Sequence, residues 1–204
     1  MKPLPLILSF LPLIAFSILA RLLPHGDVGA AGLTAAVIAV IAAVAVRPVW
    51  PPKILNATSL VLFTVLAVLG FTGSAGTDRW VATWAAAGVG LVMGLVILAL
   101  IPVIPFTEQF ARLSTPQAYW SSPTFKRINR VLSLGWGVAL LGVGASRIVA
   151  VAVNGHTTHR LPDLLLGLAV PGLILIYMLR FSKSYPDRVT HQSPGEAPAE
   201  APAK

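Results

Sequence analysis

The chain contains no cysteine among its 204 residues, which excludes disulfides, thiolate metal ligands and thiol catalysis. Charge is also scarce, because 11% of the residues are charged against roughly 25% in a typical soluble domain. The seven acidic residues all fall outside the apolar runs, in predicted loops or near the C-terminus: Asp27, Asp78, Glu108, Asp163, Asp187, Glu196 and Glu200. Ion- and proton-coupled transporters generally need carboxylates within the membrane, so this placement argues against that class.

Apolar residues are abundant, at 56% of the sequence, and the mean hydropathy is +0.81. These values predict an all-α fold, a polytopic bundle of transmembrane helices. The net charge is +8, yet the basic residues are spread over short segments between apolar runs instead of being gathered on one soluble face. We therefore expect a membrane protein that has no nucleic-acid partner.

Six apolar runs are each long enough, at about 20 residues, to cross the hydrocarbon core of a bilayer. The first run is not interpreted as a signal peptide, because Ile18 stands where a cleavage site wants a small residue. The predicted spans are residues 4–23, 29–46, 54–71, 80–104, 131–153 and 164–181. Residues 1–183 thus form a six-helix transmembrane domain. Residues 184–204 end in GEAPAEAPAK and are expected to be a disordered cytoplasmic tail, because they cannot bury enough apolar surface.

The basic residues predict the orientation, since cytoplasmic segments collect lysine and arginine. With six spans, one side of the membrane would hold eleven of the fifteen: Lys2, Arg47, Lys53, Arg112, Lys126, Arg127, Arg130, Arg180, Lys183, Arg188 and Lys204. The opposite side would hold the other four: Arg21, Arg79, Arg147 and Arg160. We therefore expect a bacterial inner-membrane protein with both termini in the cytoplasm.

One long polar stretch, residues 105–130, interrupts the apolar blocks and is the first place to seek a specific activity. Its start predicts a short amphipathic helix at the membrane surface, from about Thr107 to Leu113, with Thr107 as the capping residue. Phe106, Phe110 and Leu113 would share the apolar face. Glu108 and Arg112 would form an exposed pair, worth about 0.3 to 0.5 kcal/mol.

The rest of this stretch combines aromatic and basic side chains. Tyr119 and Trp120 follow in a proline-bounded turn, and Lys126, Arg127 and Arg130 form a basic cluster. Such side chains at a membrane edge suit a protein partner or anionic lipid headgroups. They also suit an aromatic belt and positive charges that only fix the topology, and the sequence leaves both interpretations open.

Three features lie inside the predicted spans. Arg147 is the one deep ionisable residue, and it is either a snorkelling side chain or a buried anchor for an anion or a carbonyl. Pro171 and Gly172 predict a bend in the sixth span, which is either ordinary or part of a binding site. Gly90 and Gly94 have a spacing that lets another helix approach closely, including a helix of a second copy.

The histidines offer the only candidate metal ligands. His25, His156 and His159 lie in predicted outer loops, with Asp27 and Asp163 nearby in sequence, so they either bind zinc or copper or are solvated loop residues. No phosphate-binding glycine loop, zincin helix or nucleophile elbow occurs in the sequence. We therefore expect a non-enzyme with no cofactor.

Two regions carry a family resemblance. The first span opens with the motif Phe10-Leu11-Pro12-Leu13, and the later positions are Trp120, Phe125, Arg127, Asn129, Leu134, Trp136 and Gly137. Together with the order of apolar runs, they resemble the intracellular septation protein A family of small bacterial inner-membrane proteins. The loop TEQFAR departs from the form typical of that family. Together with the Ala-, Val- and Pro-rich composition, it is similar to small membrane proteins of actinobacteria.

The resemblance implies a role in cell-envelope synthesis, septation or membrane homeostasis, exercised through membrane lipids and other envelope or division membrane proteins. It implies no catalytic residues. The alternative function is a transporter or channel for an anion or another small solute. It would use the break at Pro171 and Gly172, with Arg147 as the nearest fixed charge.

Overall fold

The computed structural model describes residues 3–23, 27–46, 52–154 and 164–192, and no strand occurs within those ranges. The predicted all-α fold is therefore confirmed. The helices are α1 (Pro3–Leu22), α2 (Val28–Ala45), α3 (Ile54–Thr72), α4 (Ala75–Leu100), α5 (Phe106–Ala111), η2 (Gln117–Tyr119), α6 (Pro123–Asn154), η3 (Leu165–Ala169) and α8 (Val170–Gln192).

Five helical segments are long and apolar enough to cross a membrane, which indicates a multi-pass membrane protein. They are Val28–Ala45, Ile54–Thr72, Trp80–Leu100, Pro123–Val153 and Leu165–Val189. In α1 the apolar segment Leu4–Ala20 is shorter.

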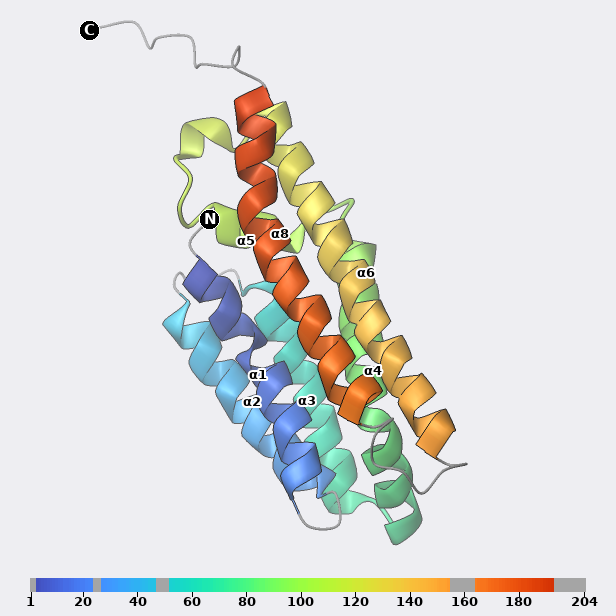
Figure 1. The fold of residues 1–204 in the computed structure, drawn as a ribbon. Coiled ribbons are helices and arrows are strands. Elements are labelled where there is room, and N and C mark those ends of the chain that lie inside the picture. The colour runs from blue at the N-terminus through green and yellow to red at the C-terminus, as the bar shows by residue number, and fades with distance from the viewer. Residues whose placement is uncertain (1–2, 24–26, 47–51, 155–163, 193–204) are drawn as a thin grey trace, which may run out of the picture.

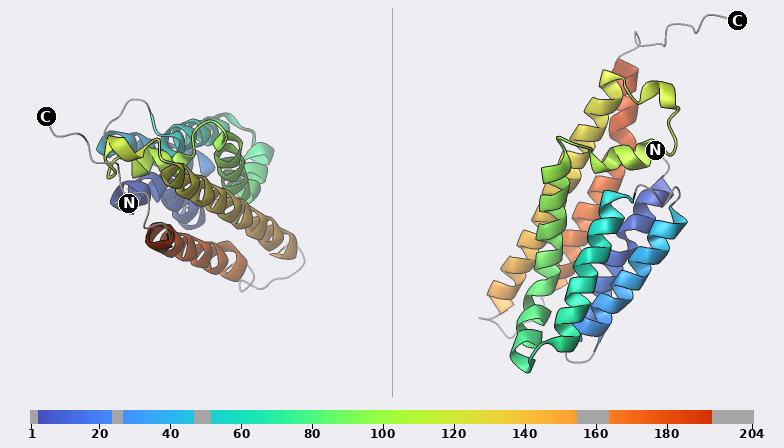
Figure 2. Two further views of the ribbon diagram at one scale, coloured as in Figure 1. Left: turned by 90° about the horizontal axis from the view of Figure 1, so that it is seen from above. Right: turned by 180° about the vertical axis from the view of Figure 1, so that it is seen from behind.

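The long helices run side by side as an elongated bundle (Figure 1). Helices α1, α2 and α3 pack together, α4 packs against α6, and α8 lies along α6. Figure 2 shows the same arrangement from above and from behind. The short helix α5 lies at the end of the bundle where α1 begins and towards which α8 ends. We call this end the arm end.

Aromatic contacts join α1 to α3 and to α6. Phe16 of α1 packs on Phe63 of α3 with ring centroids 5.1 Å apart. Phe10 of α1 stacks on Trp136 of α6 at 4.5 Å, and the Trp136 indole N–H donates to Ser182 Oγ of α8 over 2.9 Å. Trp136 is fully buried, so a single side chain connects three helices.

Small residues set the distance between α4 and α6. A Cβ atom placed on Gly90 would lie 2.8 Å from the backbone nitrogen of Gly144, and one on Gly94 would lie 2.9 Å from the carbonyl oxygen of Gly137. The predicted close approach at Gly90 and Gly94 is thus confirmed, but the partner helix belongs to the same chain. Since α6 covers both glycines, the expectation that they form an oligomer contact is corrected.

Helix α6 begins earlier than predicted, at Pro123 instead of about Val131. Proline is favoured in the first helical turn, and Ser122 Oγ accepts the backbone N–H of Phe125 over 3.2 Å as a cap. The basic cluster Lys126, Arg127 and Arg130 therefore lies on the helix, not in a loop before it.

Helix α8 continues beyond the predicted start of the tail, so residues 184–192 are helical instead of disordered. Phe181 and Tyr185 lie one helical turn apart, and their ring centroids are separated by 5.1 Å. This contact favours a helix beyond the apolar run. The extension also places Asp187, expected in the tail, within the helix. Residues 193–204 lie outside the described residues.

The predicted bend near Pro171 takes the form of a π-helical turn, η3, directly before α8. The backbone N–H of Val170 reaches the carbonyl of Leu165, five residues back. Proline has no N–H and its ring clashes with the carbonyl of the preceding turn, so a wider turn accommodates it. Pro171 is buried, whereas a Cβ on Gly172 would meet no atom within 4 Å.

The contact between α4 and α6 gives a matched test with two glycines of one helix. We expect Gly90→Ala to lower stability in detergent by about 1 to 3 kcal/mol, because the new methyl group meets backbone that cannot move aside. Gly88→Ala is the control, since its Cβ would meet no atom within 4 Å and alanine favours the helix. Thermal unfolding of the two variants measures the difference, and equal midpoints would contradict the proposed contact.

Candidate functional site

The polar stretch folds into a compact arm, which we define as residues 105–122. Its helix α5 begins at Phe106, with Pro105 as the capping residue and no side-chain cap. The Thr107 hydroxyl lies 2.8 Å from the backbone carbonyl oxygen of Asn129, to which it donates, and 2.9 Å from Ser133 Oγ. The prediction that Thr107 caps the helix is wrong. Because the helix starts one residue before it, Thr107 is fully buried against α6 and joins the arm to that helix.

A polar contact also joins the arm to the start of α3, and a second one joins the residue before α3 to the end of α2. The backbone N–H of Ile54, the first residue of α3, donates to Gln109 Oε1 over 2.8 Å. The preceding residue, Lys53, donates from Nζ to the Val46 carbonyl oxygen at the end of α2, also over 2.8 Å. Burial lowers the pKa of Lys53 from its ordinary value of 10.5, because the charged form loses solvent. The backbone N–H at the start of α3 and the backbone carbonyl after α2 have no intrahelical partner, and the side chains of Gln109 and Lys53 hydrogen-bond to them instead.

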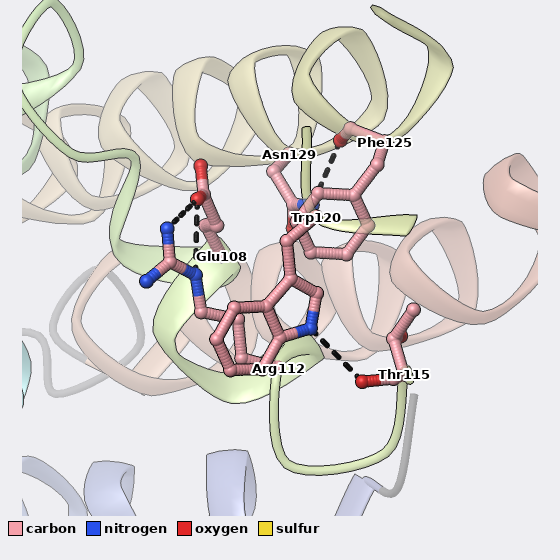
Figure 3. Close-up of polar contacts among 6 residues, drawn as sticks. All are labelled: Glu108, Arg112, Thr115, Trp120, Phe125 and Asn129. Carbon is pink, nitrogen blue, oxygen red and sulfur yellow. Dashed lines mark hydrogen bonds and ion pairs between the residues drawn. The ribbon is translucent and has the colours of Figure 1, made fainter. Parts of the chain in front are cut away.

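The predicted pairing of Glu108 with Arg112 is present and extends to an aromatic ring (Figure 3). Arg112 Nε donates to Glu108 Oε1 over 3.1 Å, and the guanidinium carbon lies 4.8 Å from the centre of the Trp120 ring. The Trp120 indole N–H in turn donates to the Thr115 carbonyl oxygen over 2.9 Å. These contacts link α5, the Trp120 ring and the backbone at Thr115 to one another.

Glu108 is not the exposed residue that the sequence predicts, because only 7% of it is accessible. Arg112 remains partly exposed, with 42% of its side chain accessible. The reason is that α5 packs closely on α6, which covers the carboxylate but leaves the outer guanidinium in contact with solvent. A half-covered pair of this kind loses more when one partner is removed than an exposed pair does.

The predicted apolar face of α5 is confirmed. Phe106 and Phe110 are buried with ring centroids 6.2 Å apart, and Leu113 packs against the core. However, Thr107 and Glu108 are buried as well, so α5 is covered on more than its apolar side.

The remaining candidates of the polar stretch stay on the surface. Tyr119 is 42% exposed, and Lys126, Arg127 and Arg130 are exposed along the first turns of α6. The structure therefore brings these four residues, together with Arg112 and Trp120, to the arm end of the bundle.

The intramembrane candidates lie elsewhere. Arg147 is partly buried near the far end of α6, and Pro171 and Gly172 lie in the first turn of α8, which begins at that same far end. The structure does not bring these residues to the arm.

Most of the predicted metal ligands, His25, His156, His159 and Asp163, fall outside the described residues. Asp27 is described, and its Oδ1 accepts the backbone N–H of Ala30 over 2.9 Å as the cap of α2. Among the residues that the structure describes, no group of three or more metal-binding side chains is found.

Sequence reasoning missed the burial of polar side chains near the arm end. The buried polar side chains of the described ranges are Ser9, Lys53, Asn56, Ser59, Thr107, Glu108, Asn129, Ser133 and Ser182. Each lies in the part of its helix or loop nearer the arm end. A weak signal exists in the spacings Asn56 to Ser59 and Asn129 to Ser133, which place two polar groups on one face of a helix.

No protein-family model matches the chain, and neither the curated proteins nor the solved structures contain a match. The fold and the site together define a class, a multi-pass helical membrane protein with a packed polar arm at one end of the bundle.

Thr107 offers a direct test of how the arm is held. We expect Thr107→Val to destabilise the protein by about 1 to 3 kcal/mol, since the isosteric methyl group cannot donate and leaves buried polar groups poorly satisfied. Amide hydrogen exchange over residues 105–122 should accelerate. Thr64→Val, at an exposed threonine of α3, is the matched control and should change neither quantity. Unchanged exchange in the arm of Thr107→Val would show that this contact does not hold it.

Proposed function

We propose that this protein is a six-span protein of the bacterial inner membrane that acts in the cell envelope without catalysing a reaction. It works through contacts of its arm end with another envelope or division protein and with anionic lipid headgroups. In this proposal both termini and the arm lie in the cytoplasm, and α5 lies at the membrane interface.

The length and packing of α1 support a sixth span. Helix α1 has 20 residues, which corresponds to about 30 Å of helix and to the thickness of the hydrocarbon core. Its buried residues Phe10 and Phe16 pack on α6 and α3, so it is an integral part of the bundle. The start of α1 and the end of α8 lie at one end, as an even number of spans requires (Figure 1).

One observation carries the proposed role, the outer surface of the arm end. Tyr119, Arg112 and the basic cluster on α6 are exposed there, on a segment held by buried contacts. Aromatic and arginine side chains on a preorganised surface are the residues that anchor protein partners. Lysine and arginine near a membrane surface also attract anionic headgroups.

The resemblance to the intracellular septation protein A family supports an envelope role. The positions that carry it include Trp120 in the arm, Arg127 on the exposed part of α6 and Trp136 at the junction of three helices.

A transporter would need polar groups near the middle of the bundle. In the described ranges, the buried polar side chains lie nearer the arm end, whereas Arg147 and Pro171 lie towards the far end. No observation in these ranges favours the transporter, so we base no proposal on it.

The topology can be tested with a reporter enzyme that is active only in the periplasm. We expect a fusion after Lys204 to be inactive and a fusion in the turn between α3 and α4, after Gly73, to be active. Activity of the Lys204 fusion would contradict the orientation and the even number of spans.

The partner surface can be tested by complementation of a deletion strain with altered septum placement, cell shape or envelope stress. We expect Tyr119→Ala combined with Lys126→Gln, Arg127→Gln and Arg130→Gln to fail while the protein level in the membrane stays normal, since all four side chains are exposed. Trp80→Ala is the control, because Trp80 is 66% exposed near the opposite end of the bundle. Full complementation by the combined variant, or a deletion strain normal in all three respects, would refute the proposed role.

A further inference from the structure

An open groove runs along the bundle between α6 and α8. Its volume is about 750 Å³, and its walls come from Val131 to Gly142 on α6 and from Leu173 to Phe181 on α8. The lining residues are almost entirely apolar, including Leu134 and Val138 on one side. Gly135 and Gly142 also line the groove, and a Cβ atom on Gly135 would lie 3.0 Å from the end of the Met178 side chain.

The length of the groove matches one leaflet of a bilayer. From Val131 to Gly142 the helix rises about 16 Å, and half of the hydrocarbon core is about 15 Å thick. The groove begins at Val131, in the part of α6 nearer the arm end, and α6 and α8 both continue past it in that direction (Figure 1). It is therefore placed to hold an acyl chain of a lipid in the leaflet next to the arm.

The two walls of the groove lead to arginines. Arg127 lies one helical turn before Val131 on the same face of α6, and Arg188 lies two turns after Phe181 on the same face of α8. Both are exposed. Six of the seven lysines and arginines of the two helices lie in their parts nearer the arm end, namely Lys126, Arg127, Arg130, Arg180, Lys183 and Arg188, against one acidic residue, Asp187; the seventh is Arg147.

We infer that this groove is a binding site for an anionic glycerophospholipid, with an acyl chain between α6 and α8 and the phosphate at Arg127 and Arg188. The inference rests on the membrane-spanning architecture proposed above, but not on a protein partner of the arm.

Charge favours a lipid over a helix of a second copy. Copies inserted in one membrane share their orientation, so a second α6 or α8 in the groove would bring its own basic end beside Arg127 and Arg188. Like charges at that distance repel, whereas a phosphate is attracted.

The charge requirement can be tested on the full-length protein by native mass spectrometry in mild detergent, with titration of phosphatidylglycerol and of phosphatidylcholine. We expect the wild type to prefer phosphatidylglycerol, and Arg127→Gln with Arg188→Gln to weaken its binding about tenfold. Lys126→Gln with Lys183→Gln is the matched control, because it removes the same charge from the same helices on other faces. An equal loss in both double variants, or no preference in the wild type, would overturn the site.

The groove itself is tested by Val138→Trp, which fills it at a position that is 56% exposed. We expect this variant to lose bound phosphatidylglycerol, while Leu95→Trp, at a residue 58% exposed on α4, keeps it. Retention by Val138→Trp, or a dimer cross-linked through residue 138 in place of bound lipid, would overturn the inference.

The same variant separates this inference from the proposed function, since Val138 lies outside the arm. Loss of lipid with normal complementation would leave the site in place and deny it the envelope role. Normal lipid binding by Tyr119→Ala alone, which keeps Arg127, combined with failure to complement would support the partner surface independently.

Discussion

The arrangement of the bundle depends on the contacts of one buried side chain, Trp136. In a membrane, lipid tails are as apolar as leucine, so helices are held by close packing and by hydrogen bonds. The indole ring supplies both, because its face stacks on Phe10 of α1 and its N–H donates to Ser182 of α8. An indole N–H buried among apolar side chains without an acceptor would be costly, so the hydrogen bond to Ser182 favours keeping α8 against α6 at this point.

The same face of α6 also holds the arm. Asn129, Ser133 and Trp136 are spaced four and three residues apart, so they lie along one side of the helix. The first two meet Thr107 of α5, and the third meets α1 and α8. Helix α6 therefore sets the position of the arm relative to the long helices. The exposed guanidinium of Arg112, which lies over the Trp120 ring, is positioned together with the arm.

Hydropathy and length predicted the all-α fold and most of the long apolar helices, because the energy of placing a residue in a membrane depends mainly on its own side chain. The roles of Thr107 and Glu108 depend instead on which helix covers α5, and a local pattern contains no such information. The glycine spacing at Gly90 and Gly94 gave the close approach but not the partner, since the motif has the same form for a helix of the same chain and for one of a second copy. The extension of α8 to Gln192 was missed because its sequence is polar there, and the one ring contact that favours the helix, between Phe181 and Tyr185, is a weak signal.

The faces of α6 differ in what they contact: some are covered by other helices of the chain and one is open. One face carries Asn129, Ser133 and Trp136, and glycines on an adjacent side let α4 approach, so these sides are closed by protein. The face from Val131 to Gly142 lines the open groove beside α8. A side closed by buried polar contacts holds one geometry, whereas an open apolar side takes its neighbours from the surrounding membrane. The exposed basic side chains of α6 lie where these sides meet the arm, so the lipid and protein contacts proposed above would both fall at this level of the bundle.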